Sequence, residues 1–121
     1  MTAAPGTPGV FTFTNERDAP PVKEQPRVEV LSWRAIETPA GELYLMMFRE
    51  TGVVRNTSAV VSVDASRRLL TTSSGREYVL HGPPEEEVVA KGMLQGNAVR
   101  IGLATARDVS DRLWHQFQEA R

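Results

Sequence analysis

The chain has 121 residues, of which 40% are hydrophobic and 24% are charged. This composition is typical of a globular domain, and the chain is too short for two ordinary domains. Fourteen Lys and Arg residues against fifteen Asp and Glu residues give a formal net charge of -1, which excludes a strongly basic, phosphate-seeking domain. The absence of cysteine excludes disulfides, thiolate metal sites, iron–sulfur clusters and a cysteine nucleophile.

Five of the eight prolines lie in residues 1–26, and this segment is expected to form a disordered arm. Proline lacks the amide donor that a sheet or helix needs, and it restricts the residue before it. Phe11 and Phe13 form the short apolar run of the arm, which could bind the domain or a protein partner. The arm's composition favours the alternative, a tail that only keeps the protein soluble. Residues 27–121 are then expected to form a single α+β domain.

The N-terminal sequence lacks the basic segment and the apolar run of a secretory signal. The longest apolar stretch, residues 43–48, is far shorter than the roughly 20 residues that span a bilayer. We therefore expect a cytoplasmic protein that makes no membrane contact.

Alternating apolar and polar residues, typical of strands with one buried face, recur from residue 27 onward. The expected strands cover residues 28–36, 42–48, 59–63, 68–73 and 76–81. Within the expected strand 42–48, residues 43–48 are apolar at successive positions, which predicts a central strand that is covered on both faces. The short connections predict antiparallel neighbours, because a parallel crossover needs a dozen or more residues. The sequence thus predicts an antiparallel meander of about five strands, with residues 98–103 as a sixth strand or an extended connector.

Two helices are expected to pack on this sheet. The first begins at Pro84, which suits the first position of a helix, and residues 85–87 place three glutamates at its positive dipole end. Gly96 and Asn97 are expected to end this helix near Gln95, because both residue types adopt the left-handed conformation easily.

The second helix, over about residues 105–120, has the strongest signal in the chain. Thr105 and Asp108 have the spacing of a capping box, and no helix breaker follows them. Ala106, Val109, Leu113 and Phe117 recur at helical spacing and form the predicted buried stripe. The opposite side is charged, and its members are spaced for ion pairs: Arg107 with Asp111, and Asp108 with Arg112.

The chain contains no convincing catalytic motif, so it is expected to be non-enzymatic. His81 precedes the first helix, where an anion could bind, but the three glutamates there oppose one. His115 lies four residues after Asp111, a spacing that also arises on solvent-facing helices, and the H-E-x-x-H metal pattern is absent. The G-x-S-x-G motif is absent around Ser73, and no phosphate-binding glycine loop is present. We therefore expect no metal and no cofactor.

Trp114 is the most informative candidate for a protein interface. On a helical wheel it lies at the rim of the predicted buried stripe of the second helix. It either covers the edge of the core, the favoured interpretation, or anchors a partner, since tryptophan is enriched among interface hot spots.

Three arginines, Arg67, Arg68 and Arg76, flank two adjacent hairpin ends. If the fold gathers them at one edge of the sheet, they could contact a phosphate backbone; otherwise they form a charged, solvent-facing surface. Few aromatic side chains accompany them for base stacking.

By elimination, the sequence predicts a small non-enzymatic protein–protein interaction or regulatory domain, whose partner could be a second copy of the chain. Trp114, Phe11 and Phe13 are its candidate partner-binding residues. The alternative is a small nucleic-acid-associated regulator that uses the three arginines.

Overall fold

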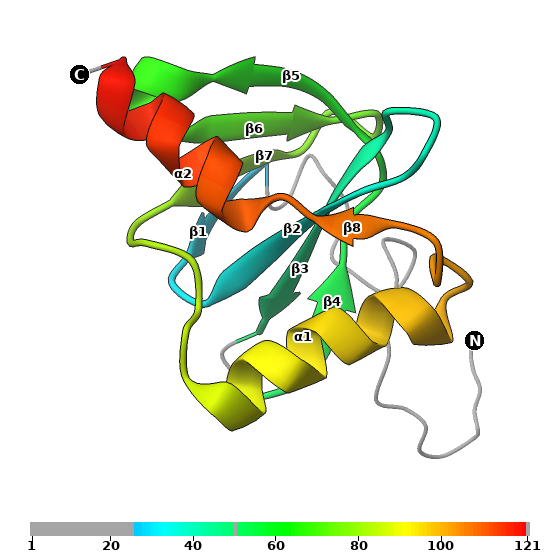
Figure 1. Ribbon diagram of the computed structural model, residues 1–121. Coiled ribbons are helices and arrows are strands. Elements are labelled where there is room, and N and C mark those ends of the chain that lie inside the picture. The colour runs from blue at the N-terminus through cyan, green and yellow to red at the C-terminus, as the bar shows by residue number, and fades with distance from the viewer. Residues whose placement is uncertain (1–25, 50, 121) are drawn as a thin grey trace.

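The computed structural model describes residues 26–49 and 51–120, and it confirms the α+β class with a mostly antiparallel sheet and two helices (Figure 1). Within these residues the sheet has eight strands instead of about five: β1 (Arg27–Val30), β2 (Trp33–Glu37), β3 (Leu43–Phe48), β4 (Val54–Asn56), β5 (Val60–Asp64), β6 (Leu69–Thr72), β7 (Glu77–Leu80) and β8 (Arg107–Asp108). The helices are α1 (Val88–Arg100) and α2 (Ser110–Glu119), and a 3-10 turn, η4 (Ala65–Arg67), connects β5 to β6.

The first predicted strand divides into β1 and β2 at residues 31–32. β1 pairs in parallel with β7, whereas β2 pairs antiparallel with β3. The strand order is β1-β7-β6-β5-β3-β2-β8, with β4 also paired to β3. Because only two residues join β1 to β2, which lie near opposite ends of this order, the sheet must curl strongly.

The predicted meander is present over β5, β6 and β7, which pair antiparallel in chain order. Asp64 accepts a hydrogen bond from the Arg67 amide, as expected for the turn that precedes β6. Gly75 has a φ of 91° in the next turn, a conformation that glycine adopts without strain. The expectation that all neighbouring strands are antiparallel is wrong for β1 and β7, because the break at residues 31–32 lets the chain change its pairing partner.

Two hydrophobic clusters lie on opposite faces of β2 and β3. The first is enclosed by the curled sheet and α2 and contains Trp33, Leu45, Met47 and Tyr78, among others. The second lies under α1 and contains Ile36, Met46, Val54, Leu94 and Ala98. Successive residues of β3 enter different clusters, which confirms the prediction that this strand is covered on both faces.

Helix α1 differs from its predicted bounds. It begins at Val88, where the Glu87 carboxylate accepts hydrogen bonds from the first amides, and it continues through Gly96 and Asn97 to Arg100. The predicted stop at Gly96 and the strand over residues 98–103 are therefore wrong. Asn97 is completely buried against the sheet, and this tertiary packing outweighs the local tendency to end the helix.

Helix α2 begins at Ser110, later than predicted, because residues 107–108 pair with β2 as β8. The predicted capping box does not form, since the Asp108 carboxylate accepts the Ser110 amide instead. The predicted ion pairs along the helix are also replaced, because Arg107 and Arg112 both contact Glu37 of β2. The predicted stripe is confirmed for Val109, Leu113 and Phe117, which are buried in the first cluster. It is wrong for Ala106, which precedes the helix and packs against the second cluster.

Truncation of this stripe should destabilise the whole domain. Leu113→Ala removes a side chain that is buried between α2 and the sheet, and we expect it to lower the free energy of unfolding by about 2–5 kcal/mol. Chemical denaturation measures this change. Gln118→Ala on the exposed side of the same helix is the control, with an expected effect within about 0.5 kcal/mol. Equal effects of the two substitutions would contradict the packing of α2.

Candidate functional site

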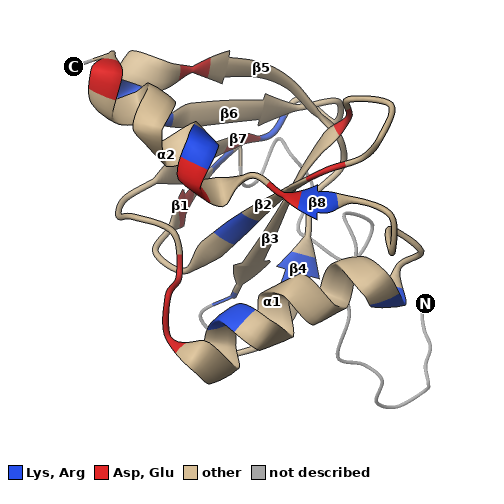
Figure 2. Cartoon of the chain, viewed as in Figure 1, with Lys and Arg blue, Asp and Glu red and all other residues tan. Residues whose placement is uncertain are grey.

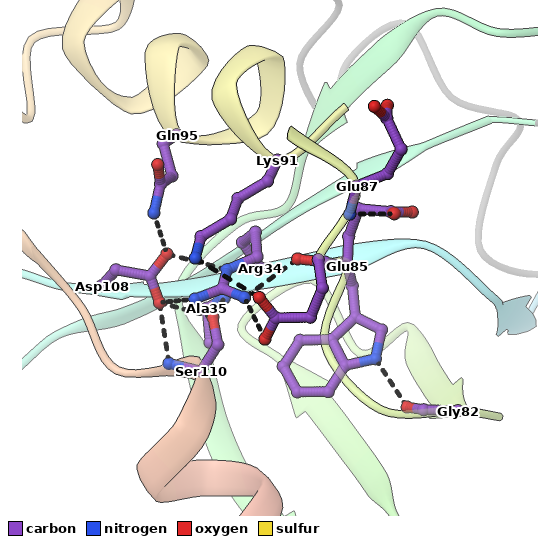
Figure 3. Close-up of polar contacts among 11 residues, drawn as sticks. Arg34, Ala35, Gly82, Glu85, Glu87, Lys91, Gln95, Asp108 and Ser110 are labelled. Atoms are coloured by element: carbon purple, nitrogen blue, oxygen red, sulfur yellow. Dashed lines mark hydrogen bonds and ion pairs between the residues drawn. The ribbon is translucent and has the colours of Figure 1, made fainter. Parts of the chain in front are cut away.

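The most extensive polar cluster in the described part of the chain centres on Arg34 of β2, whose exposure is 3% (Figure 3). Its Nε and Nη2 atoms donate to the two oxygens of Asp108, over 2.9 Å and 3.0 Å. Its Nη1 atom donates to the backbone carbonyl of Glu85 over 2.9 Å, and it also contacts the Glu86 carboxylate at 3.4 Å. Each nitrogen of the guanidinium thus contacts at least one oxygen atom, and the positive charge is balanced inside the fold.

The Asp108 carboxylate likewise accepts several hydrogen bonds. Besides Arg34, it accepts hydrogen bonds from the Ser110 amide over 2.9 Å, the Ser110 hydroxyl over 2.6 Å and the Gln95 side chain over 2.8 Å. The Ser110 hydroxyl in turn accepts the Ala35 amide of β2 over 2.8 Å. This cluster, named here the Arg34–Asp108 junction, therefore ties β2, β8, α1 and α2 together.

The junction is built to hold charge, not to transfer protons. Burial alone would raise the pKa of Asp108, but hydrogen bonds from Arg34, Ser110 and Gln95 outweigh it and lower the pKa from 3.8 to about 2. Burial likewise opposes the charge of Arg34, whose pKa is nevertheless raised by the hydrogen bond and charge of Asp108. A general acid or base works best with a pKa near the operating pH, and Asp108 is far from it.

A cavity of about 250 Å³ lies beside the junction, at the C-terminal end of α1. Its walls are mostly apolar and include Ile36, Leu103 and Ala106, with Gln95 and Asp108 as polar members. Those two polar groups are hydrogen bonded to each other. Specific recognition of a small molecule needs a few polar groups that are aimed at the ligand, and here they are engaged within the protein.

The three arginines of the predicted nucleic-acid surface do not form one patch. Arg67 and Arg68 precede β6, whereas Arg76 follows the turn at the other end of that strand. Arg76 is buried, and the Arg68 guanidinium lies 5.7 Å from the centre of the Trp114 ring. Of the three, Arg67 has the exposed side chain that a phosphate contact requires.

Trp114 lies at the edge of the first cluster. Its ring centre is 6.5 Å from that of Trp33 and 6.0 Å from that of Phe117, and Arg68 stacks over it. The rim position inferred from helical spacing is therefore observed, and the ring is engaged within the domain. A role of Trp114 in partner binding stays a prediction. Phe11 and Phe13 lie outside the described residues.

The two histidines have carboxylate neighbours near them in the fold. His81 contacts Glu29 of the neighbouring strand β1, and His115 lies 3.3 Å from Glu119 one turn along α2. The start of α1, considered above as an anion site, is occupied by the Glu87 carboxylate. Residues 26–49 and 51–120 contain no group of three or more His, Asp or Glu side chains that could hold a metal ion.

The outer face of α1 is a surface that the sequence analysis did not identify. We define it as the side opposite Leu94, Asn97 and Ala98, and it carries Val88, Val89, Gly92, Met93, Gly96 and Val99. Its large side chains are highly exposed: 82% for Val88, 66% for Val89, 49% for Met93 and 60% for Val99. Apolar residues on both sides of a helix are the available signal in the sequence, and the expected stop at Gly96 concealed it by shortening the helix.

Comparisons with known proteins give no match: no protein family, curated protein or solved structure is similar to this chain. None of the helices in the described ranges is both long enough and apolar enough to cross a membrane.

Removal of the Asp108 charge should change both the stability and its dependence on pH. The pKa of Asp108 is lower in the folded chain than its ordinary value of 3.8. Its stabilising contribution is therefore complete above about pH 4 and is lost as the pH falls towards 2. We expect Asp108→Asn to destabilise the domain by about 3–5 kcal/mol at pH 7, because buried Arg34 loses its closest counter-ion and keeps only the longer contact with the exposed Glu86.

Urea unfolding between pH 7 and pH 2 measures both effects. The wild type should lose about 2 kcal/mol more than Asp108→Asn on acidification below pH 4. Glu42→Gln, at an exposed carboxylate outside the junction, is the control and should keep the wild-type pH dependence. Parallel pH profiles for the wild type and Asp108→Asn would show that Asp108 is not held as an ion.

Proposed function

We propose that this domain acts by binding protein, with the outer face of α1 as its interface. The observation that carries the proposal is the exposure of Val88, Val89, Met93 and Val99 on one continuous helix surface. Contiguous apolar patches with a charged rim are typical of protein interaction sites. Here the rim carries Glu86 and Lys91 on one side of the patch and Arg100 at its end.

The way α1 is held supports this proposal. Its inner side packs Leu94 and Ala98 into the second cluster, and its Gln95 side chain donates to Asp108 of the junction. The outer face is therefore presented on a rigid element. A rigid interface favours affinity, because less conformational entropy is lost on binding.

Binding, and not catalysis, fits the described polar groups best. The carboxylate with the largest resolved change in pKa, Asp108, is saturated by hydrogen bonds inside the fold. Trp114 and the three arginines are less well placed as interfaces than α1, because Trp114, Arg68 and Arg76 are partly or fully covered. The cytoplasmic location stays a prediction of the sequence.

Site-specific photo-cross-linking in the expressing cell tests this proposal. A benzophenone amino acid in place of Val89 should yield a discrete adduct, because this position faces the bound partner. Val61 on β5 is the matched control, since its exposure of 64% resembles that of Val89, and it should yield no discrete adduct. The absence of an adduct at Val89, or equal adducts at both positions, would contradict the proposal.

A further inference from the structure

We propose that the partner of α1 is a second copy of the chain, and that the two α1 helices pair antiparallel through their outer faces. This inference rests on the proposed function. Four features of the outer face support it: its glycines, its symmetry, its charges and its size.

The first feature is the pair of glycines in the middle of the helix. Gly92 and Gly96 lie on the outer face, and a Cβ atom at either position would meet no atom within 4 Å apart from its chain neighbours and the adjacent backbone of its own helix. Neither residue has a positive φ. The fold of one chain therefore gives no reason for a residue that destabilises the interior of a helix relative to alanine. Close approach of a second backbone is a reason, because the missing side chains leave room for it.

The second feature is the symmetry of the face about Leu94. Gly92 and Gly96 lie two residues before and after Leu94, and Val89 and Val99 lie five residues before and after it. We place a two-fold axis perpendicular to the helix, at the level of Leu94. An antiparallel copy related by this axis has Gly96 opposite Gly92 and Val99 opposite Val89. Such a surface is complementary to itself, as a two-fold dimer requires.

The third feature is the distribution of charge along α1. Residues 85–87, three glutamates, lead into the helix, Lys91 pairs with one of them near its start, and Arg100 ends it; Figure 2 shows acidic residues in red and basic residues in blue. In an antiparallel pair the acidic end of each helix lies beside the basic end of the other, and the helix dipoles are opposed. A parallel pair would place like charges side by side. The charges therefore select the antiparallel orientation.

The fourth feature is the size of the face, which indicates the class of interface it can form. The exposed apolar side chains of α1 amount to roughly half of the about 800 Å² that a standard interface takes from each partner. A surface of this size is typical of a transient, reversible dimer rather than a permanent one.

Sedimentation equilibrium of the purified full chain, from about 1 μM to about 1 mM, tests the inference. The average mass of the wild-type protein should rise with concentration from that of one chain towards that of two. Gly92→Ala with Gly96→Ala should raise the dimer Kd at least tenfold, because the added methyl groups hold the backbones apart. In dilute, monomeric protein the same double variant should raise the Tm by about 5 °C, because alanine favours the helix.

These opposite effects separate an interface from a structural role. A substitution that only damages the fold would lower both the stability and the dimerisation. Gly82→Ala, at a glycine outside α1 that also has open space at its Cβ position, is the matched control and should leave the Kd unchanged.

Two results would overturn the inference: a wild-type chain that stays monomeric at every concentration, or a double variant that dimerises as strongly as the wild type. Neither result decides the proposed function, which the cross-link at Val89 tests. An adduct at Val89 with the mass of another protein, together with a monomeric purified chain, would keep α1 as an interface and exclude the second copy. The lack of any adduct at Val89 would contradict both the interface on α1 and the dimer.

Discussion

Arg34 carries a positive charge into a site that is almost closed to water, and the arrangement of the surrounding elements follows from how this charge is compensated. A buried ion pair stabilises a fold only when its hydrogen bonds offset the cost of desolvation. Here the Asp108 carboxylate and the Glu85 carbonyl accept hydrogen bonds from the guanidinium. Gln95 and Ser110 donate the remaining hydrogen bonds to the carboxylate. These groups come from β2, β8, both helices and the segment before α1, so they can satisfy one another only when all of these elements are in place.

The junction also determines which side of α1 meets solvent. Gln95 turns towards Asp108, and Leu94 and Ala98 enter the second cluster, so the helix has one orientation on the sheet. The opposite side then presents Val89, Gly92, Gly96 and Val99 to solvent. A helix that served only this fold would carry polar residues there. The apolar outer face is therefore the feature that the fold leaves unexplained and on which the proposed binding role rests.

Local patterns in the sequence predict those parts of the fold that depend on periodicity. The continuous apolar run in residues 43–48 predicts a strand that is buried on both faces, and the spacing of Val109, Leu113 and Phe117 predicts the buried stripe of α2. The break at residues 31–32 could not be predicted, because it depends on which distant strand each half of the run pairs with.

The candidate site was less predictable for the same reason. Arg34 and Asp108 are 74 residues apart, and in the sequence each resembles an ordinary exposed charge. Gly96 and Asn97 look like a helix stop until the burial of Asn97 against the sheet is known. The two apolar sides of α1 could have been recognised only with the helix extended to Arg100.

Disulfide trapping tests the antiparallel pairing of α1 most directly, because the chain has no cysteine of its own. Val89→Cys and Val99→Cys are made as separate single variants, mixed in equal amounts and oxidised. Trypsin places position 89 in the peptide 77–91 and position 99 in the peptide 92–100, so each disulfide is identified by its mass. Random pairing of equal amounts would make the mixed 89–99 disulfide about half of the product, and the antiparallel pair predicts a share well above this half, since only this pair brings the two Cβ atoms within bonding reach. A predominance of 89–89 and 99–99 disulfides, or a purely statistical mixture of the three, would contradict it.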